Sequence, residues 1–163
     1  MSGNLGIEAV DKEPYIFFSY NTEDQEKIGE IALELHDKQL NIWYDKGISR
    51  TSDEEWQEQI ANHIRNAGII CFFISNGIFL KEDSFVKKEF ELSKKQQQKI
   101  CIVMMDKINP KEIPPKYDFW WVEIENTQCI QAVGLSPKEI AKEIYKPIYF
   151  AFFVYFFCNF LWR

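Results

Sequence analysis

The segment from Ser84 to Glu91 contains the residue types and spacing in this sequence with the clearest potential for chemistry. We expect it to form the first two turns of a helix, on which Phe85 and Glu89, four residues apart, lie above one another. A carboxylate beside an aromatic ring, at the mouth of an α/β sheet, can hold a ribose and stabilise a developing sugar cation. The competing interpretation is an amphipathic helix with Val86 and Phe90 buried and Glu89 solvated.

Length, charge and cysteine content restrict the class of protein. The 163 residues suffice for one layered domain, and the formal net charge of −6 argues against a protein that binds nucleic acid. The four cysteines lack the CxxC spacing of a metal site, and Cys71 and Cys101 lie inside apolar runs. This usage fits a reducing compartment, so we expect a cytoplasmic protein, and the first residues show no secretory signal.

Several common catalytic motifs are missing from the sequence. Neither GxGxxG nor GxxxxGK[ST] occurs, which argues against a Rossmann dinucleotide site and a P-loop. The two histidines, His36 and His63, lie in predicted helices without partners at metal-ligand spacing, so no metal site is expected. Ser19 and Ser75 end predicted strands, but no GxSxG elbow surrounds either serine.

Apolar runs alternate along the chain with helical stripes. Strands are expected at residues 15–19, 41–44, 69–75, 100–105 and 120–124. Capping-box patterns predict helix starts at residues 22–25, 52–55 and 136–139, and a further helix is expected to run from residue 85 to about residue 95. This alternation predicts βαβ units and a parallel sheet, in which ligands bind outside the carboxyl ends of the strands.

Four segments, in order, resemble the conserved boxes of the TIR (Toll/interleukin-1 receptor) domain family. They are Tyr15 to Tyr20, Ile42 to Ser52, Trp56 to Ser75, and Phe85 to Glu89; the last resembles the Trp-x-x-x-Glu motif of the enzymatically active members. The resemblance covers residues 14–146 and looks like the prokaryotic type of the family. It implies a flavodoxin-like three-layer fold, with a central parallel five-stranded sheet and helices on both faces.

The resemblance also implies one of two functions. Many TIR proteins cleave NAD+ at the nicotinamide–ribose bond, releasing nicotinamide and ADP-ribose or a cyclic isomer, in antiviral or cell-death immunity. Others are non-catalytic adaptors that bind further TIR domains. The catalytic glutamate of the motif maps onto Glu89, whereas Phe85 replaces the motif tryptophan, keeping an apolar wall without the indole N–H. NAD+ would be a substrate, so the resemblance implies no cofactor and no metal.

The resemblance, together with the expected carboxyl ends of the strands (the rim of the sheet), predicts the remaining site residues. Trp56 maps onto an aromatic residue that faces the nicotinamide, although its helical stripe with Ile60 equally fits a core residue. Activity in this family depends on assembly, and the loop after the second strand is expected to gate the pocket and dock onto a neighbouring TIR domain, although Asp45 and Lys46 also fit solvated loop charges. The expected substrate-contacting residues are Phe18, Ser19, Tyr20, Trp43, Asp45, Trp56, Ser75 and Phe85. The expected assembly loop comprises Lys46, Gly47, Ile48, Ser49, Arg50, Thr51 and Ser52.

The two ends of the chain differ from the domain between them. Residues 1–13 are expected to be a flexible leader, and residues 147–163 form an apolar, aromatic-rich segment. A membrane-spanning helix needs about twenty apolar residues, so this segment is short for one. Lys146 and Arg163 flank it, which fits contact with a membrane surface. Packing on the domain and truncation of a longer span are alternatives, but we expect self-association or membrane contact.

Overall fold

The computed structural model describes residues 14–45 and 54–160, with side chains described in 14–45 and 57–150. Five parallel strands form one sheet in the order β2-β1-β3-β4-β5, which confirms the predicted flavodoxin-like fold. The predicted leader 1–13 lies outside the described residues. The strands are β1 (Ile16–Ser19), β2 (Ile42–Tyr44), β3 (Ile69–Ile74), β4 (Ile100–Met104) and β5 (Cys129–Gln131).

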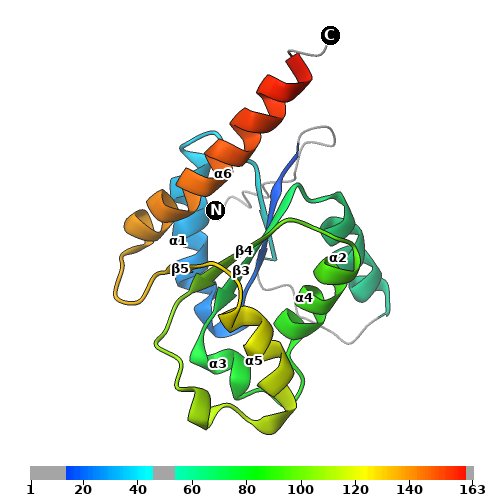
Figure 1. The fold of residues 1–163 in the computed structure, drawn as a ribbon, viewed down its shortest axis with the longest axis vertical. Coiled ribbons are helices and arrows are strands. Elements are labelled where there is room, and N and C mark those ends of the chain that lie inside the picture. The colour runs from blue at the N-terminus through cyan, green and yellow to red at the C-terminus, as the bar shows by residue number, and fades with distance from the viewer. Residues whose placement is uncertain (1–13, 46–53, 161–163) are drawn as a thin grey trace, which may run out of the picture.

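Helices cover both faces of the sheet (Figure 1). Buried residues of α1 and α6 pack on one face, and those of α2, α3, α4 and α5 pack on the other. Short 3₁₀ turns η1 (Thr22–Asp24), η2 (Pro110–Glu112) and η3 (Pro115–Tyr117) lie in the connections. The α-helices are α1 (Gln25–His36), α2 (Glu54–Asn66), α3 (Asn76–Phe79), α4 (Phe85–Lys95), α5 (Asp118–Glu125) and α6 (Pro137–Phe160).

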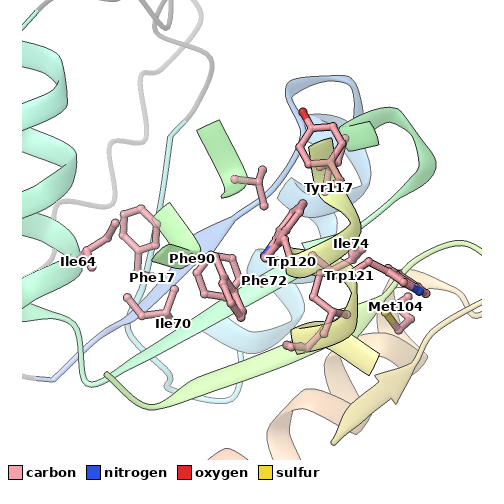
Figure 2. Close-up of a cluster of buried hydrophobic side chains, with 14 of the residues drawn as sticks. Phe17, Ile64, Ile70, Phe72, Ile74, Phe90, Met104, Tyr117, Trp120 and Trp121 are labelled. Carbon is pink, nitrogen blue, oxygen red and sulfur yellow. The ribbon is translucent and has the colours of Figure 1, made fainter. Parts of the chain in front are cut away.

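The central strands are apolar, except for Ser19 at the end of β1, because both of their faces are covered. All six residues of β3 are buried, and alternate side chains enter the two core clusters, with Phe72 on the α4 face and Phe73 on the α1 face. Figure 2 shows Phe72 and Phe90 packed together in the first cluster, where their ring centroids lie 5.2 Å apart at 67°. This contact fixes α4 against the sheet, next to the end of β1.

The helix starts agree with the predicted caps to different degrees. The predicted capping box at Ser136 is confirmed. The backbone N–H of Ser136 donates to Oε2 of Glu139 at 2.9 Å, and the backbone N–H of Glu139 donates to Oγ of Ser136 at 3.3 Å. The prediction of a capping box at Thr22 is wrong. This segment forms the 3₁₀ turn η1, and α1 begins only at Gln25, without a hydrogen bond to a capping side chain. The first residues of the box at 52–55 lie outside the described residues.

The predicted fifth strand at residues 120–124 is wrong, because this segment belongs to helix α5. Trp120, Trp121 and Ile124 are buried while Val122 is 52% exposed, which is a helical pattern and not the alternation of a strand. The aromatic and β-branched residues favour a strand by propensity alone, and packing against the sheet overrides that preference. The fifth strand is β5, three residues long, at the edge beside β4.

The apolar C-terminal segment belongs, as far as Phe160, to one long helix. The first half of α6 packs against α1, and its second half extends beyond the sheet (Figure 1). Ile148 is buried, whereas Tyr149 and Phe150 are 53% and 70% exposed. Within residues 14–45 and 54–160, no helix is long and apolar enough to cross a bilayer. Membrane contact and self-association through this segment remain predictions.

Candidate active site

The carboxylate of Glu89 is buried where α4 meets the sheet. Glu89 is 5% exposed and shares the inner face of α4 with Val86 and Phe90. The interpretation of Glu89 as a solvated surface residue is therefore wrong. Because burial of a carboxylate is unfavourable unless other groups satisfy it, the position demands local hydrogen bonds.

Two buried serines hold Glu89 in place. Ser19, at the carboxyl end of β1, donates a hydrogen bond from Oγ to Oε2 of Glu89. Ser93, one turn further along α4, donates from Oγ to the backbone carbonyl of Glu89 at 2.7 Å. Ser19 and Ser93 are both fully buried. The sheet thus fixes the carboxylate, while the helix itself fixes the main chain, and hydrogen bonds to a charged acceptor are the stronger kind.

Glu89 faces a cavity of about 210 Å³ between α2 and α4. Among the described residues, one acid and one lysine line this otherwise largely apolar space. Phe85 lines the same cavity, which confirms the expected stacking of Phe85 and Glu89 on one helix face. The walls come from Gln57, Ile60, Ala61 and Ile64 of α2 and from Phe85, Lys88, Glu89 and Leu92 of α4.

Phe85 also lines a second cavity, of about 180 Å³, on the side of the loop after β1. Asn21 and Thr22 contribute to this second cavity, together with Lys81 and Asp83 before α4. Phe85 is therefore shared by the linings of the two cavities. The second cavity is lined by the loops that follow β1 and β3, at the carboxyl end of the sheet, where ligands bind in open parallel sheets.

Helical spacing of the lining residues accounts for the part of the site that the sequence interpretation missed. On α4, Lys88 and Leu92 follow Phe85 at i+3 and i+7, and both line the cavity with Glu89. On α2, Gln57 begins the same i, i+3, i+4, i+7 series. Continuing the helical spacing from Phe85 would have predicted Lys88 and Leu92. The pairing of α2 with α4 is a tertiary contact without a local signal.

The rim residue Ser75 lies next to an acidic pair and does not line the Glu89 cavity. Its Oγ donates to Oδ2 of Asp24 at 2.6 Å, and the N–H of Asn76 donates to Oδ2 of Asp106 at 2.9 Å. Burial raises the pKa of Asp24; the Ser75 hydrogen bond opposes this shift, and the charge of Asp106 adds to it. Ser75 thus joins the end of β3 to the start of α1.

Gly77 allows the loop after β1 to approach α3 closely. A Cβ at position 77 would lie 2.3 Å from Nδ2 of Asn21 and 3.1 Å from Oε2 of Glu23. Asn21 is itself buried, at 5% exposure. The absence of a side chain at Gly77 therefore sets the position of the residues that follow Ser19.

The structure places Phe18 and Tyr20 away from the Glu89 cavity. Phe18 packs edge-to-face on Phe73, with ring centroids 4.8 Å apart, on the α1 face of the sheet. Tyr20 is buried in the same cluster, and its hydroxyl donates to the backbone carbonyl of Asp45. Tyr20 and Asp45, both predicted to contact substrate, connect the end of β1 to the end of β2, and neither lines the Glu89 cavity.

Trp43 packs in an aromatic stack and also stands apart from Glu89. Its ring lies 4.9 Å from that of Phe17 and 4.0 Å from the imidazole of His63, nearly parallel to both. The Tyr15 hydroxyl donates to the His63 carbonyl at 2.7 Å. Burial lowers the pKa of His63 and raises that of Tyr15 to about 12. These contacts hold α2 against β1 and β2.

The remaining predicted site residues are Trp56 and the assembly loop, which the structure describes in part or not at all. Trp56 belongs to the first turn of α2, the helix that forms one wall of the cavity, but its side chain lies outside the described part. The predicted assembly loop, residues 46–52, lies outside the described residues altogether. Their roles remain predictions.

A family model described as TIR domain matches residues 16–144. The chain is similar to the crystal structure of the RPS4 and RRS1 TIR domain heterodimer, with 16% identity and a TM-score of 0.60 over 84% of this chain and 96% of that chain. It is also similar to the TIR domain of the Toll-related Receptor TRR-2 from the lower metazoan Hydra magnipapillata, with 15% identity and a TM-score of 0.52 over 71% and 82%. No curated protein matches the chain.

Proposed function

The chain belongs to the TIR domain family, and from that premise we propose that it cleaves the nicotinamide–ribose bond of NAD+, with Glu89 as the catalytic residue. The products would be nicotinamide and ADP-ribose or a cyclic ADP-ribose isomer. The observation that carries the proposal is the buried carboxylate of Glu89, held by Ser19 and facing a cavity that Phe85 also lines.

The chemistry needs little more than such a carboxylate. Departure of nicotinamide leaves an oxocarbenium-like sugar, as in glycoside cleavage; water then adds at C1′ and loses a proton to give ADP-ribose, or an adenine nitrogen of the same molecule adds there to give a cyclic isomer. Nicotinamide leaves as a neutral molecule, so no general acid is required. A single carboxylate can hydrogen-bond the ribose hydroxyls and stabilise the positive charge that develops on the ring. Ile60 and Ile64 line the opposite wall, and their apolar surface lowers the local dielectric and strengthens that stabilisation.

We further propose that assembly of several copies switches the activity on, in cytoplasmic immune signalling. The predicted docking segment is the loop at residues 46–52. Support comes from the family, whose members associate through their TIR domains, and from the solved RPS4 and RRS1 TIR domain heterodimer, which has the same fold.

A non-catalytic adaptor is the second candidate function. Phe85 stands where the active members of the family carry a tryptophan, and this observation favours the adaptor. Phenylalanine preserves the apolar wall of the cavity but offers no N–H donor. In this alternative, Glu89 would serve only to fix α4 against β1 through Ser19.

Nicotinamide release from NAD+ by concentrated, purified full-length protein tests the proposal. Glu89→Gln keeps an acceptor for Ser19 but removes the negative charge, so it should abolish nicotinamide release. Glu91→Gln is the matched control, because Glu91 is an exposed residue of the same helix that pairs with Lys87 at 3.7 Å. Its activity should equal that of the wild type.

Thermal unfolding followed by circular dichroism verifies that both variants are folded. Full activity in folded Glu89→Gln would reject the catalytic assignment. No nicotinamide release from the wild type, even when assembled, would favour the adaptor.

A further inference from the structure

Lys88 combines with Glu89 to give the cavity between α2 and α4 a charge at each end. Among the described residues that line this cavity, Lys88 is the single basic one. Its side chain is 53% exposed, whereas Glu89 is 5% exposed. The cavity therefore has a carboxylate in its interior and an ammonium group at its solvent side.

The ammonium group of Lys88 pairs with an exposed carboxylate that an anion can replace. Its Nζ lies 2.5 Å from Oδ2 of Asp83 and 5.3 Å from the centre of the Phe85 ring. The side chain of Asp83 is 70% exposed. Because exposed ion pairs contribute only about 0–1 kcal/mol, a stronger anion can displace Asp83 at small cost. The Phe85 contact keeps the ammonium group next to the cavity.

The size of the cavity determines which part of a dinucleotide it can hold. Its volume of about 210 Å³ lies below the roughly 300–1,000 Å³ of pockets that enclose a whole drug-sized ligand. With the scissile bond at Glu89, the nicotinamide and its ribose occupy the cavity. The diphosphate, attached to the 5′-oxygen of that ribose, must then lie outside, on the solvent side.

We propose that Lys88 binds the diphosphate of the substrate and thereby selects a dinucleotide over an uncharged nucleoside. The inference rests on the proposed NAD+ cleavage and assigns a specificity-determining residue to it. A local cation has particular value here, since the chain carries a net charge of −6 and would otherwise repel an anionic substrate. Lysine suits this role because its ammonium group is a compact positive charge on a flexible side chain, which can move to contact a phosphate.

The neighbouring Lys87 provides a matched control. It carries the same charge in the same helical turn but does not line the cavity. Its Nζ lies 3.7 Å from Oε1 of Glu91 and 5.6 Å from the ring centre of Tyr117. Removal of either lysine changes the net charge equally, so a difference between the two variants reports position and not overall charge.

The test compares Lys88→Gln with Lys87→Gln on two substrates that share the scissile bond. NAD+ contains the diphosphate, and nicotinamide riboside lacks it. Lys88→Gln should lower kcat/KM for NAD+ about tenfold more than for nicotinamide riboside, as expected for one lost charge-assisted hydrogen bond. Lys87→Gln should change both values alike. Equal losses on the two substrates in Lys88→Gln would overturn the inference.

Binding of ADP-ribose separates this inference from the proposed function. ADP-ribose carries the diphosphate but no nicotinamide, so its affinity, measured by calorimetry, is independent of turnover. If the wild type released no nicotinamide, NAD+ cleavage would fail as the function. Weaker ADP-ribose binding by Lys88→Gln than by Lys87→Gln would still support Lys88 as the diphosphate-binding residue. Equal affinities, or no binding by any of the proteins, would overturn it.

Discussion

Ser19 donates a hydrogen bond to the carboxylate of Glu89, which joins the carboxyl end of β1 to α4 across 70 residues of sequence. Both side chains are buried, so the bond is shielded from water. The orientation of Glu89 therefore depends on the central sheet as well as on its own helix. A carboxylate held in this way needs little reorganisation when positive charge develops nearby.

Ser19→Ala should reduce the proposed NAD+ cleavage about tenfold, because a hydrogen bond to a charged group contributes about 1.5–3 kcal/mol. Ser93→Ala is the control, since Ser93 is equally buried but its hydroxyl donates to the backbone carbonyl of Glu89 and not to the carboxylate. The measurement is nicotinamide release, accompanied by urea unfolding of each variant. Equal activities in Ser19→Ala and Ser93→Ala would show that the Ser19 contact does not position the carboxylate.

Gly77→Ala should destabilise the fold by about 1–3 kcal/mol, the usual cost of overpacking a filled site. The new Cβ would lie 2.3 Å from Nδ2 of the buried Asn21. Gly29→Ala offers the opposite expectation: its nearest contact would be the Tyr44 hydroxyl at 3.9 Å, and alanine in a helix interior gains about 0.5–1 kcal/mol over glycine. Urea unfolding compares the two. A stability for Gly77→Ala at or above the wild-type value would contradict the packing argument.

Folding stability should fall as the pH drops below the ordinary pKa of histidine. Burial lowers the pKa of His63 below its usual 6.5, so protons bind more tightly to the unfolded chain. The contribution of neutral His63 is therefore complete above pH 6.5 and is lost as the pH falls through the lowered pKa. His63→Phe, which can still stack on Trp43, should lose less unfolding free energy between about pH 7.5 and pH 5.5.

Urea unfolding at several pH values measures that slope. His36→Gln is the control, because it removes an exposed histidine of α1 and leaves the stack of His63 on Trp43 intact. A wild-type slope that persists in His63→Phe would assign the pH dependence to other groups.

Turnover per chain should rise steeply with protein concentration if assembly activates the proposed NAD+ cleavage. Mass action favours the assembled form at high concentration. A dilution series of nicotinamide release, paired with sedimentation velocity at the same concentrations, measures both quantities. Strict proportionality between rate and concentration over the whole series would argue that a single chain is active on its own.

Local sequence patterns predicted the elements that border the site. The apolar runs at β1 and β3 and the helical spacing of Phe85 and Glu89 all appear in the structure, because each depends on neighbours within a few residues. The strand predicted at Trp120 and Trp121 was wrong. Their intrinsic preference for strands contributes less free energy than the packing that places them in α5. Three-residue β5 is too short to produce a clear pattern.

Local sequence patterns could not predict the contacts between segments that are distant in the chain. The hydrogen bond from Ser19 to Glu89 was not predicted, because it depends on how α4 packs against β1; the expected contact of Ser19 with substrate stays a prediction. Phe18 and Trp43 end or border apolar strands, as rim residues do, but the alternation of the sheet directs Phe18 into the opposite core, and His63 of α2 stacks on Trp43. The sequence shows which residues can reach the rim, and tertiary packing determines which side of it they face.

Among the described residues, Phe85 is the one side chain that lines both cavities, one beside Glu89 and the other beside Asn21. A shorter side chain at this position should widen both cavities. The width of the molecule that fits next to Glu89 should therefore depend on the size of this one aromatic side chain.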